Sequence, residues 1–493
     1  MRRERSWGPF SASDPPHMAH YDVLVIGTGP AGQKAAVQSA KLGKKVGIIE
    51  RKQAVGGVCI NSGTIPSKSL REAVLYLSGF HQRTVYGATY RLKHTITMED
   101  LALRCRHIVA EEIQIIQKQM ARNQVDLIFG TAHFLDPHRL AIQQANDTIE
   151  HTADYVVIAV GSQPARPADV PFDGHSVIDT DEWLTVECLP TALIIVGGGV
   201  IGSEYASIAA TMGIKVMLID QRPRLLEFVD HEIINALQVQ MGEIGVGLYL
   251  DEQVVHIQKQ AHGQVAVQLR SGKQLEASMV MYSAGRIGAT EDLNLDAVGI
   301  SPDARGRLRV NEHFQTGIPH IYAVGDVIGF PALASTSMQQ GRLAACHAFG
   351  LPCDVKTQLL PYGIYTIPEI SMVGPTEQDL MRDQVPYEVG VARYQEIARG
   401  KLIGDEIGLL KLLFHKQTRQ LLGVHGIGEG ATELIHIGQA VMAHGGKIDY
   451  FVDNVFNYPT LAECYMVAAL AGLNRLPRPW LPDNLAARQG GIA

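Results

Sequence analysis

Apolar and polar positions follow one pattern that occurs twice along the chain: a short apolar run, a glycine-rich turn and a helix-like stretch. The first copy has its apolar run at 21–26, the turn GTGPAG and its helix-like stretch at 33–42. The second copy has them at 192–196, in GGGVIG and at 203–212. A β-branched apolar run before such a turn indicates a buried strand, so the pattern predicts two strand–turn–helix units.

The remaining segments show other periodicities. Helices are expected at 99–122 and 334–349, whereas residues 248–285 alternate as strands of the second unit. Residues 361–473 mix strand and helix patterns without a further phosphate-type glycine turn. We therefore expect an α/β fold with two Rossmann-like dinucleotide-binding domains and a C-terminal α+β domain.

The charge and hydropathy of the chain exclude two classes of binding partner. The 493 residues carry a net charge of −7, and no lysine- or arginine-rich block stands out from the background. The most apolar segments are interrupted by glycines and fall well below the roughly 20 residues that a membrane-spanning helix needs. Neither a nucleic acid nor a membrane is expected as a partner.

The cysteines favour a reducing compartment. They lack paired short spacings and a histidine pattern, so neither a disulfide framework nor a metal site is expected. A cytoplasmic location fits best. The six cysteines are Cys59, Cys105, Cys188, Cys346, Cys353 and Cys464.

Both glycine turns have the GxGxxG spacing of a phosphate-binding loop. The first glycine permits the bend, the second lets backbone approach a pyrophosphate, and the third allows close packing of the helix. The N-terminus of that helix then stabilises the phosphates. These glycines are Gly27, Gly29 and Gly32 in the first turn and Gly197, Gly199 and Gly202 in the second.

An acidic residue closes the second strand of each unit. Glu50 follows VGII and Asp220 follows VMLI, each 18 residues after the third glycine of its turn. A carboxylate about 20 residues beyond the turn is placed to bond a ribose hydroxyl. The alternative for each acid is an ordinary surface carboxylate at a strand end, but two complete patterns favour two dinucleotide sites.

The segment 56–68, GGVCINSGTIPSK, carries a cysteine followed five residues later by a threonine. With the two glycine turns, it resembles the redox loop of the pyridine nucleotide-disulfide oxidoreductases, and the resemblance extends from about residue 19 to 476. That family has a second cysteine where this chain has Thr64. A threonine hydroxyl can neither form a disulfide with Cys59 nor supply a thiolate nucleophile.

The resemblance implies that the first fold binds FAD and that the second binds NAD(H) and NADP(H) as substrates. Each site would include its glycine turn and its acid. Further contacts are implied for FAD at Pro30, Gly57, Ala132, Gly161, Asp326 and Ala334, and for NAD(P) at Arg222 and Gly285.

The resemblance also implies how the chain is divided. The C-terminal domain would mediate dimerisation, so a homodimer or a higher homo-oligomer is expected. The expected segments are an extension at 1–18, an FAD-binding domain at 19–165 and 287–358, an NAD(P)-binding domain at 166–286, a dimerisation domain at 359–476 and a tail at 477–493.

Lys68 occupies the position where the family places a lysine beside the flavin, and Glu204 has the matching position after the second turn. The resemblance therefore implies an ion pair. A cation there would stabilise negative charge that develops on the reduced flavin. The alternative is a solvated lysine in the first turn of a helix.

Tyr458, in the segment NYPTLAE, replaces the histidine that the family places before a proline. A phenol with a pKa near ~10 cannot exchange a proton at neutral pH as an imidazole near ~6.5 can. Glu463 keeps its place but has no histidine to orient, so a structural role at an interface is at least as plausible.

The chain lacks the second thiol and the histidine, yet both nucleotide motifs are complete. The resemblance therefore implies hydride transfer between NADPH and NAD through FAD. Alternatives are an NAD(P)H oxidase or quinone-reducing diaphorase, a dihydrolipoamide dehydrogenase-like reductase, and a redox-sensing FAD-binding module. Arg222 and Arg224 either bind the 2′-phosphate of NADP or are solvated loop charges, and both interpretations stay open.

Overall fold

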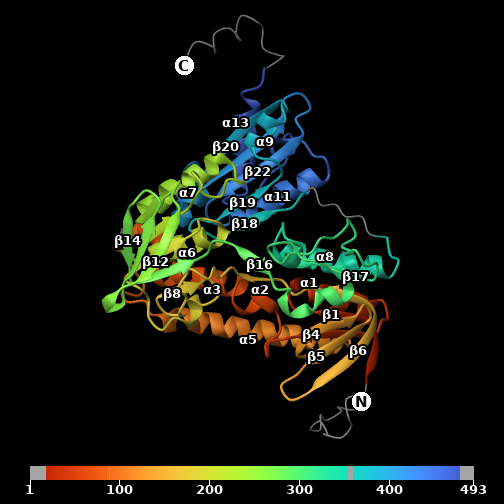
Figure 1. Cartoon of the computed structure of the whole chain (residues 1–493). Coiled ribbons are helices and arrows are strands. Elements are labelled where there is room, and N and C mark those ends of the chain that lie inside the picture. The colour runs from red at the N-terminus through yellow and green to blue at the C-terminus, as the bar shows by residue number, and fades with distance from the viewer. Residues whose placement is uncertain (1–17, 88, 353–358, 478–493) are drawn as a thin grey trace, which may run out of the picture. The chain divides into compact units, whose positions relative to one another are not determined.

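The computed structural model describes residues 18–87, 89–352 and 359–477 (Figure 1). Most of the expected extension at 1–18 and of the tail at 477–493 lies outside these residues, as does Cys353. The chain divides into two compact units, and each is treated by itself. The first comprises Met1–Thr64, Val109–Gln163 and Arg286–Asp354, and the second Ile65–Ile108, Pro164–Gly285 and Val355–Ala493.

The first unit is built on a seven-stranded sheet with the order β3–β2–β1–β6–β5–β4, in which β17 also pairs with β6. The strands β3, β2, β1, β6 and β17 are parallel, whereas β4 and β5 add an antiparallel edge. The strands are β1 (Ala19–Ile26), β2 (Val46–Glu50), β3 (Asp126–Phe129), β4 (Thr131–Asp136), β5 (Arg139–Gln143), β6 (Thr148–Ile158) and β17 (Ile321–Ala323).

Helices α1 (Pro30–Lys41) and α8 (Ala334–Ala348) pack against each other in the first unit. Pro30 occupies the first position of α1, where its fixed φ suits a helix start. Gly341 permits the close approach, because a Cβ there would lie 2.0 Å from the Ala31 carbonyl oxygen. The helices expected at 33–42 and 334–349 are thereby confirmed, with small shifts at their ends.

The second unit contains the other Rossmann-like sheet, with the parallel order β11–β10–β9–β15–β8. Helices α6 (Val200–Thr211) and α7 (His231–Glu243) accompany it, and a small antiparallel sheet β12–β13–β14 lies in the chain between β11 and β15. The strands are β8 (Val177–Asp179), β9 (Ala192–Val196), β10 (Lys215–Ile219), β11 (Val246–Tyr249), β12 (Val254–Lys259), β13 (Val265–Leu269), β14 (Gln274–Ala277) and β15 (Met279–Tyr282).

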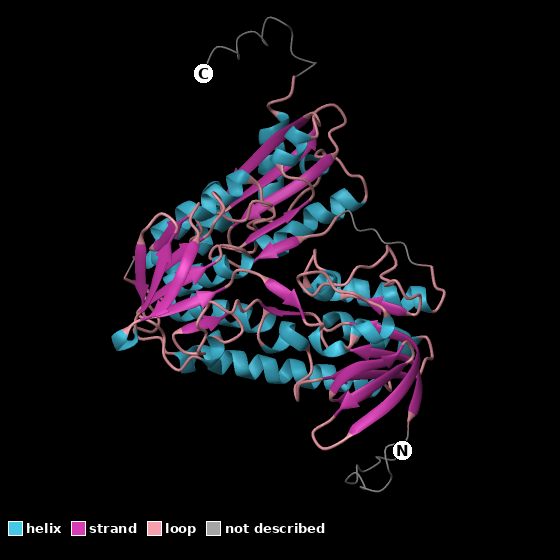
Figure 2. Cartoon of the chain, in the orientation of Figure 1, coloured by secondary structure: helices cyan, strands magenta, loops and turns pink. Residues whose placement is uncertain are grey.

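The second unit also contains a C-terminal antiparallel sheet with the order β18–β19–β22–β21–β20, accompanied by helices (Figure 2). Helix α11 packs on β22 and β19, and α13 packs on β20 and β21. The elements are β18 (Tyr362–Ile364), β19 (Ile370–Val373), β20 (Tyr387–Arg393), β21 (Leu409–His415), β22 (Leu421–Ile427), α9 (Glu377–Arg382), α11 (Ala431–Ala443) and α13 (Glu463–Leu473).

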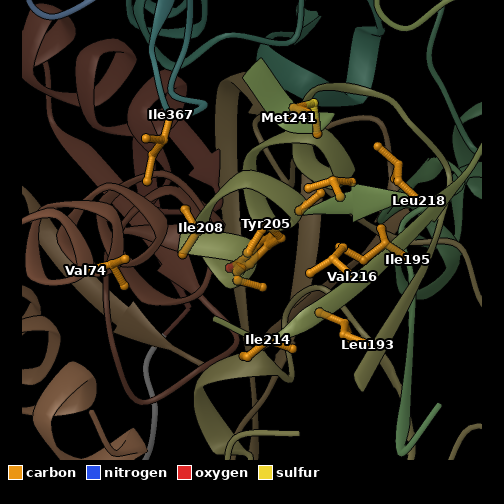
Figure 3. Packing of buried hydrophobic residues seen from close by; sticks show 14 of the residues in the cluster. Val74, Leu193, Ile195, Tyr205, Ile208, Ile214, Val216, Leu218, Met241 and Ile367 are labelled. Carbon is orange, nitrogen blue, oxygen red and sulfur yellow. The ribbon is translucent and has the colours of Figure 1, made fainter. Parts of the chain in front are cut away.

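One apolar core joins the parallel sheet of the second unit to its C-terminal sheet (Figure 3). Tyr205 and Ile208 of α6 share it with Leu218 of β10 and with Ile367 beside the C-terminal sheet. Burial of apolar surface stabilises this packing by about 25 cal/mol per Å². The elements that carry the second glycine turn and the C-terminal sheet therefore belong to one packed body.

The chain passes between the units five times, and two of these passages lie within helices. These two fall between Thr64 and Ile65 in α3 (Thr64–Ser78) and between Ile108 and Val109 in α5 (Met98–Arg122). The long helix expected at 99–122 is confirmed. Among the described residues, no helix has the length and apolar character that a membrane span requires. The remaining short elements are α2 (Gly57–Asn61), α4 (Arg83–Tyr86), α10 (Ala398–Ile403), α12 (Tyr450–Asp453), β7 (Ser162–Pro164) and β16 (Arg286–Gly288).

The α/β class expected from the sequence is confirmed by these sheets. The finer division of the chain into an FAD-binding, an NAD(P)-binding and a dimerisation domain stays a prediction.

Candidate functional site

The first glycine turn joins β1 to α1, and its glycines have different tasks. Gly27 has φ +106°, and a Cβ there would lie 2.4 Å from the Ala159 carbonyl oxygen. A Cβ at Gly32 would lie 1.9 Å from the Gly27 oxygen, whereas one at Gly29 would meet no atom within 4 Å. The first and third glycines therefore permit packing, while Gly29 keeps the N-terminus of α1 approachable, as a phosphate requires.

The second glycine turn, between β9 and α6, repeats this geometry. Gly197 has φ +105°, and a Cβ there would lie 3.0 Å from the backbone of Ala284. A Cβ at Gly202 would lie 1.9 Å from the Gly197 oxygen, and one at Gly199 would meet nothing within 4 Å. Gly285, with φ +109°, follows Ala284 three residues beyond the end of β15. Both turns thus have the form of a pyrophosphate cradle.

Glu50, at the end of β2, is buried and bonded to the first turn. Its Oε2 accepts the Thr28 backbone N–H at 3.2 Å and the Thr28 hydroxyl, and its Oε1 accepts the Lys52 N–H at 3.0 Å. The Thr28 hydroxyl in turn accepts the Gly56 N–H at 2.9 Å. Thr28 therefore links the acid, the glycine turn and the loop at 56–68, a role that the GxGxxG pattern does not reveal because the motif leaves this position unspecified.

Asp220, at the end of β10, has the corresponding bonds and one more partner. Its Oδ2 accepts the Gly198 N–H at 2.5 Å, and its Oδ1 accepts the Arg222 N–H at 2.8 Å. The Arg222 guanidinium also binds the carboxylate, through Nε at 2.8 Å and Nη2 at 2.6 Å. Burial alone would raise the pKa of Asp220, but these bonds outweigh burial and hold the pKa below its usual value.

The start of the loop at 56–68 lies against the first turn, within the first unit. Gly57 has φ +60°, and a Cβ there would lie 3.0 Å from the Gly29 Cα. Cys59 is partly buried in α2, and Thr64 is exposed at the first position of α3. The loop therefore brings the cysteine position into the unit that carries the candidate FAD turn.

The other positions expected at the FAD site lie on different elements of the first unit. Asp326 accepts the Ser162 hydroxyl at 3.1 Å, and Ser162 Oγ accepts the Arg286 Nε at 2.9 Å. Gly161, with φ +72°, follows β6, and Ala334 is the first residue of α8. Ala132 of β4 differs in character, because its side chain is buried in the apolar core of the first unit.

Lys68 and Glu204 form the ion pair that the sequence led us to expect, within the second unit. Lys68 Nζ lies 2.8 Å and 3.0 Å from the two Glu204 carboxylate oxygens. Glu204 Oε1 also accepts the Tyr365 backbone N–H at 2.8 Å, and Lys68 Nζ lies 4.8 Å from the centroid of the Tyr365 ring. The ammonium is thus held by a carboxylate and an aromatic face.

Arg71 lies one helical turn after Lys68 in α3 and contacts the segment between β18 and β19. Its side chain is 3% exposed, and its Nε donates to the Thr366 carbonyl at 3.0 Å. Its Nη2 lies 3.6 Å from Glu369, whose pKa is raised by burial. Arg71 and Tyr365 were not among the predicted site residues, because their bonds to Thr366 and to Glu204 span 295 and 161 residues that no local pattern connects.

Tyr458 is 67% exposed, and among the described residues its hydroxyl makes no hydrogen bond. Glu463 begins α13, and its Oε2 is buried without a hydrogen-bond partner in the described part of the chain. The two residues therefore do not form the bonded pair that an oriented acid–base group requires.

The two turns and their acids fit dinucleotides chemically. Each offers an approachable backbone at the N-terminus of a 12-residue helix and a buried carboxylate at the neighbouring strand end. Both turns therefore suit a dinucleotide, and their shared geometry does not distinguish FAD from a nicotinamide nucleotide.

Comparison with known proteins agrees with this geometry. Residues 21–341 match the profile of the pyridine nucleotide-disulphide oxidoreductases, and residues 360–469 match the dimerisation domain of the same family. The chain is 52% identical to the soluble pyridine nucleotide transhydrogenase of Mycobacterium bovis BCG Pasteur over 93% of this chain and 98% of that protein. It is 45% identical to the protein of that name from Vibrio parahaemolyticus, over 93% and 99%.

Solved structures have the same fold. LpdA from Mycobacterium tuberculosis superposes with a TM-score of 0.84 at 24% identity, over 92% of this chain and 99% of that one. The flavoprotein disulfide reductase RclA from Escherichia coli, solved as a Cu(II) complex, gives a TM-score of 0.83 at 27% identity, over 92% and 99%.

Proposed function

This chain belongs to the pyridine nucleotide-disulphide oxidoreductase family, and we propose that it transfers hydride between NADPH and NAD⁺ through FAD without a redox-active disulfide. One observation carries the proposal: two complete nucleotide turns accompany a threonine at the second redox position. Hydride exchange needs the nucleotides and the flavin, whereas disulfide reduction needs a second thiol at Thr64. The relatives at 45–52% identity, which are named soluble pyridine nucleotide transhydrogenases, support it.

In this proposal, different residues of the chain bind the two nucleotides and stabilise the flavin. Gly29, the N-terminus of α1 and Glu50 would hold FAD, and Gly199, the N-terminus of α6 and Asp220 would hold the nicotinamide nucleotide. Bound FAD would supply the two-electron chemistry, accepting hydride from one nucleotide and returning it to the other. Lys68, fixed by Glu204, would stabilise negative charge near the flavin.

The second unit contains one nucleotide turn of this kind among its described residues. NADPH and NAD⁺ would therefore use it in succession, so one must leave before the other binds. Such a ping-pong cycle requires no general acid, which agrees with an exposed Tyr458 in place of the family's histidine.

The protein's assembly and location complete the proposal. The dimerisation profile at 360–469 supports a homodimer or a higher homo-oligomer. The relatives' designation as soluble supports a cytoplasmic enzyme.

The test is NADPH-driven reduction of thio-NAD⁺ by the purified FAD-loaded protein, with and without a thiol-blocking arsenical. We expect rapid turnover that the arsenical does not inhibit, because no dithiol can form at Cys59 and Thr64. Oxygen and a quinone are offered in parallel. Faster turnover with either of these acceptors than with thio-NAD⁺ would favour an oxidase or a diaphorase instead, and strong arsenical inhibition would point to a dithiol enzyme.

A further inference from the structure

The carboxylates beside the two nucleotide turns accept the same pair of backbone hydrogen bonds but differ in their side-chain partners. Glu50 accepts the N–H of Thr28 in its turn and that of Lys52 two residues on. Asp220 accepts the equivalent pair from Gly198 and Arg222. The Arg222 guanidinium also binds Asp220. The Lys52 side chain, at the equivalent position of the first turn, is exposed and among the described residues makes no hydrogen bond to Glu50. A cationic side chain on the acid is therefore a feature of the second turn and not of both turns.

The guanidinium of Arg222 leaves no acceptor site on Asp220 for a ribose hydroxyl. A carboxylate offers about four lone-pair sites. Oδ1 accepts the Arg222 backbone N–H and Nε, and Oδ2 accepts Gly198 N–H and Arg222 Nη2. A 2′-hydroxyl can bond Asp220 only if the Arg222 side chain moves away.

Arg222 itself retains donors in the bound position. It contacts Asp220 through the edge formed by Nε and Nη2, so Nη1 and the second Nη2 proton stay available. The described residues provide no other hydrogen-bond acceptor for this guanidinium, and its side chain is 36% exposed. A planar fork of this kind can bridge a carboxylate and a phosphate at once.

Gly198 makes the arrangement possible. A Cβ at this position would lie 3.0 Å from Asp220 Oδ2 and 2.4 Å from the Leu225 side chain. The missing side chain therefore lets the carboxylate reach the backbone N–H, and this bond anchors Asp220 while Arg222 changes position.

We propose that Asp220 and Arg222 form a two-position latch that allows one site to accept both nicotinamide nucleotides. In the closed position Arg222 neutralises Asp220 and offers its free edge to the 2′-phosphate of NADP(H). In the open position Arg222 swings into solvent, and Asp220 accepts the 2′-hydroxyl of NAD(H).

The latch rests on the proposed function, which requires both nucleotides at the second turn, and it adds how that turn accepts them. A 2′-phosphate beside an uncovered carboxylate would be repelled by like charge, and a hydroxyl beside a covered one would find no acceptor. The closed position removes the repulsion of the 2′-phosphate, and the open position gives the 2′-hydroxyl an acceptor.

Equilibrium binding of two adenosine fragments tests the latch without hydride transfer. The FAD-loaded protein is titrated calorimetrically with 2′,5′-ADP, which carries the 2′-phosphate, and with 5′-AMP, which carries the 2′-hydroxyl. For Arg222→Ala we expect 2′,5′-ADP to bind roughly 10- to 100-fold more weakly, since a charge-assisted pair is lost and Asp220 is exposed. The same variant should bind 5′-AMP as tightly as wild type or more tightly.

Two further variants guard against a merely structural effect. Arg222→Lys keeps the charge but lacks the planar fork that binds a carboxylate through two parallel hydrogen bonds, so we expect an intermediate loss for 2′,5′-ADP only. Asp220→Asn frees Arg222, and it should leave 2′,5′-ADP binding unchanged or tighter while weakening 5′-AMP.

Two outcomes overturn the latch. Equal weakening of both fragments by Arg222→Ala would make Arg222 a structural cap of the strand end, and loss of 2′,5′-ADP binding in Arg224→Ala but not in Arg222→Ala would assign the phosphate to Arg224. Neither outcome depends on turnover. If thio-NAD⁺ reduction failed while the fragment pattern held, the latch would stand and the proposed function would fall.

Discussion

Lys68 Nζ lies 2.8 Å from Oε2 of Glu204, whose side chain is 4% exposed. Glu204 is held in turn by the Tyr365 backbone N–H. Because the carboxylate is buried and bonded twice, it fixes the position of a lysine that would otherwise have four rotatable bonds. The pair therefore joins α3, α6 and the strand-to-loop segment at 365 within one unit.

Replacement of Lys68 by alanine is expected to slow reduction of the bound flavin by NADPH at least about tenfold, because a preorganised cation is lost. Stopped-flow absorbance at the flavin band measures this rate. Lys118→Ala is the control, since Lys118 is an exposed lysine of α5 without an ion pair in the described residues. Equal rates in Lys68→Ala and wild type would remove Lys68 from the mechanism.

The sequence predicted those parts of the site that depend on local spacing. Both glycine turns and their acids follow from motif spacing, whereas the Lys68–Glu204 pair, 136 residues apart, was expected only from the family resemblance. The contacts of Thr28, Arg71 and Tyr365 did not follow, because they depend on which residues distant in sequence meet after folding. Asp220 and Arg222 are only two residues apart, so their pairing was possible from the sequence. The sequence could not show, however, whether Arg222 binds the carboxylate or is a solvated charge.

The three glycines of each turn are expected to respond differently to alanine. Gly29 has φ −63° and open space at its Cβ position, so Gly29→Ala should fold but retain less FAD after gel filtration. Gly199→Ala, with φ −72° and similar space, should keep its FAD and raise the KM for NADPH. Gly32→Ala should fold poorly, since its Cβ would clash with the Gly27 oxygen.

FAD absorbance per protein and KM values measure these effects, and circular dichroism checks the fold. If Gly29→Ala lost FAD no more readily than wild type, the first turn would not be the pyrophosphate cradle. If Gly199→Ala lost FAD while its KM stayed unchanged, the assignment of the two turns would be reversed.

Tyr458→Phe is expected to change the turnover of thio-NAD⁺ reduction by less than about twofold between pH 6 and 9, because hydride exchange needs no proton from this position. The exposed hydroxyl makes no hydrogen bond in the described chain, so its removal should not disturb the fold. The pH profile of kcat and of kcat/KM measures the effect. Loss of one limb of the profile in Tyr458→Phe would instead identify the phenol as an acid or base.

Lys411 of β21 is buried among three carboxylates of the second unit. Its Nζ lies 2.9 Å from Asp230, 3.2 Å from Glu232 and 2.5 Å from Glu377, and its side chain is 1% exposed. Asp230 caps α7 and Glu377 begins α9, so this one ammonium connects the Rossmann-like sheet of the unit with its C-terminal sheet.

Lys411→Met should destabilise the protein by about 3–5 kcal/mol, because it leaves the fully buried Asp230 and the partly buried Glu377 without their shared ammonium. Denaturant unfolding followed by circular dichroism measures the loss. Lys416→Met is the matched control: Lys416 is 51% exposed and lies 3.7 Å from Glu388, so its loss should cost less than about 1 kcal/mol. Equal midpoints for the two variants would show that the buried cluster adds no stability.

His425 is expected to make the protein less stable as the pH falls. Burial lowers its pKa below the ordinary value of 6.5, although Asp230 opposes this shift; Lys411 adds to it. Below about pH 6.5 the unfolded chain therefore binds a proton that folded His425 does not, so stability is full above this pH and declines beneath it, by at most about 1.4 kcal/mol per pH unit. His425→Gln should flatten the dependence of the unfolding midpoint between pH 7.5 and 5.5. The exposed His436→Gln controls for the loss of an imidazole as such and should keep the wild-type slope. A slope in His425→Gln as steep as that of wild type would mean that His425 takes up its proton equally in both states.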